Sequence, residues 1–148
     1  MSLNKKIKFN NKILHQSKLL NYFIKDLNNE KISKDANEIL KKIKSNKKYI
    51  FSRKDKILLD SLRYDGIDIQ KKYDNLYEKD PNIPTDLQVL INNNNIGMIL
   101  LRLVEIIGED QIENLGTETL YFITAVLNET NLDNLRNKII IKTLPNRV

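Results

Sequence analysis

The sequence contains no cysteine, no tryptophan and a single histidine, His15. The absence of cysteine excludes disulfide bonds and thiolate metal sites, and one histidine excludes a site with several histidine ligands. Only four glycines are present, and they form neither a phosphate-binding loop nor a nucleophile motif. We therefore predict no catalytic residues, no cofactor-binding residues, no cofactor and no metal ligands, and we expect a protein that is not an enzyme.

The chain also lacks a long apolar run. The longest one, residues 96–107, is interrupted by Gly97, Arg102 and Glu105 and is too short to span a bilayer. The first residues do not contain the apolar core of a secretory signal peptide. We therefore expect no transmembrane segment and a cytoplasmic location.

Acid–base chemistry has two weak candidates. His15 follows a basic segment and has no fixed acidic partner in the sequence, so a surface histidine is favoured over a catalytic one. Glu105 and Glu109 are four residues apart, and paired carboxylates can perform acid–base catalysis. Glu109, however, follows the expected helix end at Gly108, so a solvated edge is favoured for this pair.

The composition indicates one globular domain. The chain has 148 residues, of which 30% are charged and 41% hydrophobic, and this is enough for a real core. Asn, Lys and Ile are heavily used, which is typical of an AT-rich genome. Residues 1–79 carry 20 basic and 10 acidic side chains (net +10), whereas residues 80–148 carry 5 and 9 (net −4). This asymmetry is the strongest global feature of the sequence.

Apolar side chains recur with helical spacing along most of the chain. Helices are expected over residues 17–28, 85–91 and 96–107, and others are expected to begin near Ser33, Ser52, Asp68, Thr117 and Asp133. The predicted fold is all-α, with six or seven short helices stacked as antiparallel hairpins in an α-solenoid-like arrangement. Residues 1–12 are predicted to be a basic, flexible lead and residues 13–148 a single helical domain, with a candidate hinge near residues 80–84.

Several helix ends carry recognisable signals. Ser52 and Asp55 have the spacing of a capping box, and Gly66, Gly108 and Asn131 stand where a left-handed residue would end a helix. In the last helix, the prediction places Leu135, Ile139 and Ile140 inward and Arg136, Lys138 and Lys142 outward. Residues 57–69 and 122–134 also share a pattern: an apolar helix end, a left-handed-type residue, an aliphatic residue, then Asp.

The helix over residues 96–107 is apolar most of the way round. Met98, Leu101 and Val104 widen the stripe that the other aliphatic residues form, so burial on more than one side is predicted. The alternative is that one such stripe docks a partner helix or continues into further helical repeats.

The basic half holds candidate contacts for an anion or a nucleic acid. These residues are Lys41, Lys42, Lys44, Lys47, Lys48, Arg53 and Lys54. Clustered positive charge binds phosphates, and Tyr49 and Phe51 nearby could stack on bases. Lysine outnumbers arginine 20 to 5, which disfavours sequence-specific base reading. An ordinary solvated face is the plainer interpretation.

Three segments resemble a known group of proteins: SRKDKILLDSLRYDGI, ILLRLVEIIGED and GTETLYFITAVLNETNLDNLRNK. They resemble the helical, tetratricopeptide-like C-terminal segment of uncharacterised alphaproteobacterial proteins, over about two thirds of the chain. The resemblance implies a helical array with no assigned activity and transfers no catalytic residue.

These observations favour a non-enzymatic helical scaffold or protein-interaction module with a protein partner, either on its own or as part of a larger helical-repeat protein. The alternative is weak, non-specific nucleic-acid binding through the lysine-rich half. A groove with exposed Tyr73, Tyr77 or Tyr121 would favour the first function, and a contiguous lysine stripe would favour the second. The sequence does not indicate the oligomeric state.

Overall fold

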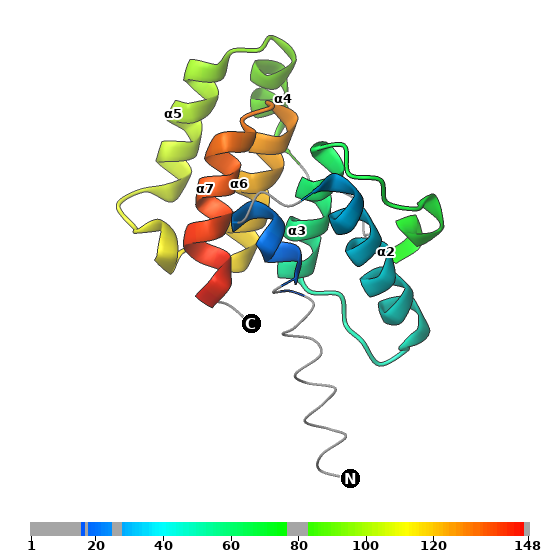
Figure 1. Ribbon diagram of the computed structural model, residues 1–148. Coiled ribbons are helices and arrows are strands. Elements are labelled where there is room, and N and C mark those ends of the chain that lie inside the picture. The colour runs from blue at the N-terminus through cyan, green and yellow to red at the C-terminus, as the bar shows by residue number, and fades with distance from the viewer. Residues whose placement is uncertain (1–15, 17, 25–27, 77–82, 147–148) are drawn as a thin grey trace.

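The computed structural model describes residues 16, 18–24, 28–76 and 83–146 (Figure 1). Residues 16 and 18–24 are helical. They are followed by α2 (Asn29–Ser45), α3 (Arg53–Tyr64), α4 (Thr85–Asn92), α5 (Ile96–Ile107), α6 (Thr117–Glu129) and α7 (Asp133–Thr143), with short 3-10 helices η1 (Lys71–Leu76), η2 (Ile112–Asn114) and η3 (Leu144–Asn146). No strand occurs among these residues, and the all-α prediction is confirmed. The predicted lead, His15, Tyr77 and most of the candidate hinge lie outside the described residues.

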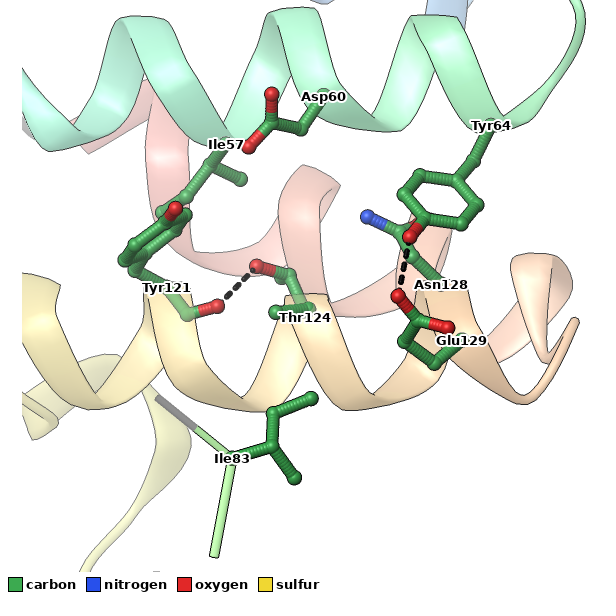
Figure 2. Close-up of a pocket in the computed structure, with 9 residues that line it drawn as sticks. Ile57, Asp60, Tyr64, Ile83, Tyr121, Thr124, Asn128 and Glu129 are labelled. Atoms are coloured by element: carbon green, nitrogen blue, oxygen red, sulfur yellow. Dashed lines mark hydrogen bonds between the residues drawn. The ribbon is translucent and has the colours of Figure 1, made fainter. Parts of the chain in front are cut away.

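The centre of the fold is the pair formed by α3 and α6, which run in the same direction. Arg53 at the start of α3 pairs with Glu118 at the start of α6, at 2.7 Å, and Tyr64 at the end of α3 donates to Glu129 at the end of α6 (Figure 2). Both contacts join residues 65 positions apart. The same offset relates the two similar segments of the sequence, residues 57–69 and 122–134.

Both central helices end as the sequence predicts. Gly66 and Asn131 have positive φ values of 83° and 58°, a conformation that glycine and asparagine tolerate best. The next amide then reaches back into the last turn: Ile67 N–H donates to Leu62 O, and Leu132 N–H donates to Leu127 O. This is the Schellman arrangement. The capping box of Ser52 and Asp55 at the start of α3 is also confirmed.

Two predicted helix starts are wrong. α2 begins at Asn29, where the Asn28 side chain accepts from Glu30 N–H at 2.7 Å, and Ser33 lies inside the helix. The predicted helix from Asp68 is instead a 3-10 helix that begins at Lys71. The reason is tertiary: Ser33 and Asn37 both donate to the backbone oxygen of Asp68, so these residues tie α2 to the loop after α3 rather than cap a helix.

Asp55 is a buried polar hub at the start of α3. Its carboxylate accepts from Tyr49 Oη at 2.6 Å, from Ser52 Oγ at 2.8 Å and from Gln16 Nε2 at 3.0 Å. Burial, together with the hydrogen bond to Asp55 and its negative charge, raises the pKa of the Tyr49 phenol above the ordinary tyrosine value. The neutral phenol is therefore part of the folded structure.

This raised pKa predicts a loss of stability at alkaline pH. A group whose pKa is higher in the folded state contributes stability below its unfolded pKa, about 10 for tyrosine, and that contribution is lost as the pH rises further. In urea titrations from about pH 7 to pH 11, the stability advantage of the wild type over Tyr49→Phe should be constant up to about pH 9. Above pH 10 it should shrink by up to about 1.4 kcal/mol per pH unit. A constant difference up to pH 11 would contradict the prediction.

Candidate functional site

The helix α5 carries an exposed apolar stripe. Only Ile99 and Leu103 of this helix are buried, whereas Met98, Leu101 and Val104 are 46%, 58% and 62% exposed. We call these three exposed residues the α5 stripe. The prediction that this helix is buried on more than one side is therefore wrong, because α5 lies at one side of the fold, with α4 as its hairpin partner (Figure 1). The alternative interpretation, a stripe available to a partner, is the one that the exposure supports.

The helix α4 extends this apolar face. Arg102 of α5 pairs with Asp86 of α4 at 2.7 Å, and the two helices are joined by a short turn, so they are antiparallel. About one helical turn closer to the loop that joins α4 and α5, this antiparallel register brings Val89 level with Met98. Val89 is 50% exposed. Nothing lies within 4 Å of a Cβ placed on Gly97, so this end of the α5 stripe is open to the backbone of another chain.

The surroundings of the α5 stripe are acidic. The segment from residue 83 to residue 116 contains one basic residue, Arg102, and five acidic residues, Asp86, Glu105, Glu109, Asp110 and Glu113, so its net charge is −4; of these, Glu113 pairs with Lys142 of α7 at 3.1 Å. The guanidinium of Arg102 already pairs with Asp86 and, at 3.3 Å, with Glu105. Glu109 and Asp110 follow Gly108, whose positive φ of 66° ends α5. Negative charge therefore gathers at one end of the stripe.

A second surface is formed by lysines at the end of α2 and just after it. Of the seven predicted contact residues, Lys41, Lys42, Lys44, Lys47 and Lys48 are exposed. The other two are placed differently. Arg53 pairs with Glu118 and lies 5.2 Å from the centre of the Tyr121 ring, and Lys54 is buried. Burial lowers the pKa of the Lys54 ammonium group, which the charge of Asp55 opposes.

The structure adds two lysines that sequence reasoning missed. Lys71 and Lys72 are exposed on η1, which packs against α2. The Nζ atom of Lys44 donates to the Lys72 backbone oxygen at 3.4 Å. Lys44 and Lys72 also lie 5.9 and 5.3 Å from the centre of the Tyr73 ring. We call the five exposed lysines of residues 41–48 together with Lys71 and Lys72 the lysine surface.

The tyrosines expected in an interaction groove do not provide one. Tyr73 and Tyr121 are only 3% and 4% exposed, and Tyr77 lies outside the described residues. Tyr121 is instead buried, and its ring makes cation–π contacts with Arg53 and Lys56. Tyr73 and Tyr121 therefore do not support either surface as a base-stacking site, whereas Tyr49 and Phe51, beside the lysine surface in sequence, are partly exposed.

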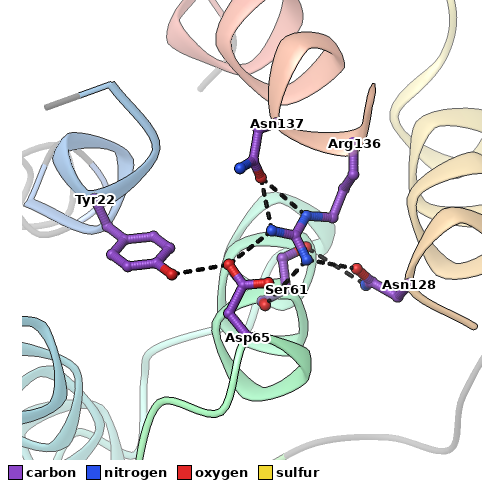
Figure 3. Close-up of polar contacts among 6 residues, drawn as sticks. All are labelled: Tyr22, Ser61, Asp65, Asn128, Arg136 and Asn137. Atoms are coloured by element: carbon purple, nitrogen blue, oxygen red, sulfur yellow. Dashed lines mark hydrogen bonds and ion pairs between the residues drawn. The ribbon is translucent and has the colours of Figure 1, made fainter. Parts of the chain in front are cut away.

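A polar pocket of about 410 Å³ lies between α3, α6, α7 and the helical residues 18–24. Arg136 reaches into its wall with 1% of its side chain exposed, so the prediction that Arg136 points outward is wrong (Figure 3). Its guanidinium donates to Asp65 Oδ2 at 2.8 Å and to Asn128 Oδ1 at 3.0 Å. Tyr22 Oη donates to the same Asp65 oxygen at 2.9 Å. The sequence carries a weak signal for this network, the presence of an arginine among the apolar residues of α7.

Arg136 has no donor left for a ligand. The two further contacts are with the Asn137 side chain, which accepts from Nε and Nη2, and with the Ser61 backbone oxygen, which accepts from Nη1. A guanidinium has five N–H groups, and here all five have an acceptor. The Arg136 cluster is therefore a structural clasp that joins α3, α6 and α7, and it does not have the open donors of an anion-binding site.

A smaller cavity lies between α3 and α6, beside Tyr64, Tyr121 and Glu129 (Figure 2). Its volume of about 20 Å³ is close to the space that one water molecule needs, about 10–15 Å³. It is too small for a substrate. Among the described residues, no group of three His, Asp or Glu side chains lies close enough together to hold a metal ion. In the same part of the chain, no helix combines the length and the apolar character needed to cross a membrane.

Comparison of the chain with protein-family models, curated proteins and solved structures finds no match. The resemblance to the helical segment of alphaproteobacterial proteins therefore stays a prediction. The candidate functional sites are therefore the two exposed surfaces, the apolar α5 stripe with its acidic edge and the lysine surface.

Proposed function

We propose that this protein is a non-enzymatic helical interaction module that binds a protein partner through the α5 stripe. The observation that carries this proposal is the exposure of Met98, Leu101 and Val104 on one helix, with the exposed Val89 on its hairpin partner α4. Contiguous exposed apolar side chains rimmed by polar residues are typical of interaction sites. The polar pocket and the small cavity are weaker candidates, because all five donors of Arg136 are occupied in the first and the second holds about one water molecule.

The arrangement of α3 and α6 supports the further proposal that the module derives from a helical repeat. The two helices are parallel and pair at a constant offset of 65 residues. Helical-repeat proteins stack equivalent helices of successive repeats in this way and offer extended surfaces for binding partners.

Replacing Leu101 with aspartate should abolish partner binding without unfolding the protein. Leu101 is 58% exposed, so an aspartate carboxylate at this position stays hydrated in the free protein. It loses its water only when a partner covers the position, and that loss weakens binding. Lysate of the source organism is passed over immobilised wild type, Leu101→Asp and Ile50→Asp, and bound proteins are quantified. Ile50 is a matched control because it is an aliphatic residue that is 82% exposed and lies outside the stripe. Proteins retained equally by Leu101→Asp and wild type would contradict the proposal, as would the absence of any bound protein.

The lysine surface favours a second candidate function, non-specific nucleic-acid binding. Seven exposed lysines gather on α2, the residues after it and η1. Phosphate contacts by lysine give affinity without sequence readout. This function uses a different face of the protein from the α5 stripe, so the two proposals can be tested separately.

If this second function is correct, binding of a labelled single-stranded oligonucleotide should weaken steeply with salt. About five phosphate contacts predict a slope near −3.5 in log K against log salt concentration. The triple variant Lys47→Glu, Lys48→Glu, Lys71→Glu should bind at least about tenfold more weakly. The triple variant Lys31→Glu, Lys34→Glu, Lys138→Glu has the same net charge but leaves the lysine surface intact. Equal weakening by both variants would show an effect of net charge alone and would reject the site.

A further inference from the structure

We infer that the occupant of the α5 stripe is a short, basic amphipathic helix of another protein. This inference rests on the proposed function and specifies the chemistry of the partner. It follows from the length of the stripe, from the charge around it and from its area.

The geometry fits one helix of about three turns. α5 has 12 residues, which corresponds to about 18 Å of helix. Its exposed side chains at positions 98, 101 and 104 form a ridge over about 9 Å of that length, and Val89 adds one exposed apolar side chain on α4. A partner helix with apolar residues at positions i, i+3 or i+4, and i+7 presents a matching stripe, and Gly97 allows its backbone to approach closely at one end.

The charge around the stripe selects a basic partner. Glu109 and Asp110 are exposed at the end of α5, and no cation in the described part of the chain forms an ion pair with either carboxylate. Glu105 lies one turn after Leu101, and its ion pair among the described residues is with Arg102, which also pairs with Asp86. Lysine or arginine residues that flank the partner's apolar positions would complete these contacts, and such complementarity steers association and determines specificity.

The same charge disfavours the other occupants. Anionic lipid headgroups and nucleic acids would meet an acidic edge. A second copy docking through its own α5 would bring two acidic edges together. The lysine surface of a second copy has the opposite charge, but α2 buries all of its large apolar residues, and the exposed Ile50 after it is a single side chain rather than an apolar stripe with helical spacing.

The area also fits a single helix better than a dimer of whole domains. The stripe and Val89 present four partly exposed side chains, and the largest apolar patch of a typical monomer is about 300–600 Å². Stable dimers bury about 800 Å² per partner. A single docked helix needs less area than a dimer of whole domains.

The test is a selection from a displayed library of helical peptides of about 20 residues, with apolar residues fixed at the spacing above and random flanking positions. The full chain is the bait. The expected result is enrichment of peptides with net positive charge. A selected peptide, measured by fluorescence anisotropy, should bind at least tenfold more weakly to Leu101→Asp and equally to wild type and Ile50→Asp. It should bind about fivefold more weakly to the double variant Glu109→Lys, Asp110→Lys at low salt, a difference that high salt should remove.

The outcomes separate the two proposals. Peptides that depend on Leu101 but have neutral or acidic flanks would overturn the basic-helix inference and leave the proposed function standing. Failure to select any peptide that depends on Leu101 would overturn both. A concentration-dependent dimer in light scattering that Leu101→Asp abolishes would overturn the inference in favour of a second copy.

Discussion

The variant Arg136→Met should lose about 3–5 kcal/mol of unfolding free energy, because removing one partner of a buried ion pair leaves the other without compensation. Arg136 is 1% exposed and Asp65 14% exposed. Methionine fills a similar volume but cannot donate a hydrogen bond. The Asp65 carboxylate would keep the Tyr22 hydroxyl and lose its only cation within the clasp. The backbone oxygen of Ser61 and the side-chain oxygen of Asn128 would lose a donor at the same time.

Urea unfolding measures this loss, and the melting temperature should fall by roughly 6–20 °C. The matched control is Arg63→Met, because Arg63 pairs with Asp74 at the surface, where the two side chains are 38% and 52% exposed. Exposed pairs contribute about 0–1 kcal/mol. A loss below about 1 kcal/mol for Arg136→Met would show that the clasp contributes no more than a surface pair.

A second variant separates the charge from the packing. If the penalty comes from the unpaired Asp65 carboxylate, then adding Asp65→Asn to Arg136→Met should restore part of the lost stability, because the buried charge is removed. The double variant should therefore lose less than the sum of the two single variants. Strict additivity would indicate that the two side chains act independently.

The variant Leu58→Ala should lose about 2–5 kcal/mol, the usual cost of removing a buried leucine side chain and leaving a cavity. Leu58 has 0% exposure on the central helix α3, and α3 makes its most extensive contact with α6. The parallel packing of these two helices is the core on which the other elements rest. The loss should appear in urea unfolding as a lower midpoint with an unchanged slope.

The matched control is the same substitution at an exposed position. Leu101→Ala should cost less than about 0.5 kcal/mol, because Leu101 is 58% exposed and buries little apolar surface on folding. Similar losses at both positions would mean that the α5 stripe is part of the core, which would contradict its proposed role as an interface. A large loss at Leu58 with none at Leu101 leaves binding as the remaining reason for an apolar residue at position 101.

The helix ends could be predicted because their signals are local. Ser52 and Asp55 are three residues apart, and the bonds of the capping box involve only the side chains and backbone of that turn. Gly66 and Asn131 likewise need only their own backbone conformation. Ser33 shows the limit of this reasoning. Serine suits a helix start, but here its hydroxyl bonds to Asp68, 35 residues away, and no local pattern announces that contact.

The candidate site was predictable in part. The exposure of Lys41, Lys42 and Lys44 could be predicted because they lie outside the apolar stripe of α2, and Lys47 and Lys48 follow the end of that helix. The burial of Lys54 could not be predicted, since the first turn of a helix is exposed or covered depending on its neighbours. Lys71 and Lys72 were missed because η1 joins α2 only through the tertiary fold.

By itself, the sequence determined the helical class, most helix ends and the opposite charges of the two halves, because helical periodicity, capping and net charge depend on residues close together in the chain. Only the tertiary structure decided which apolar faces are covered. It left Leu101 exposed on a helix whose pattern predicts burial, and it buried Arg136 on a helix whose pattern predicts exposure. The physical reason is that burial depends on which other helices pack against a face, and those helices come from distant parts of the chain.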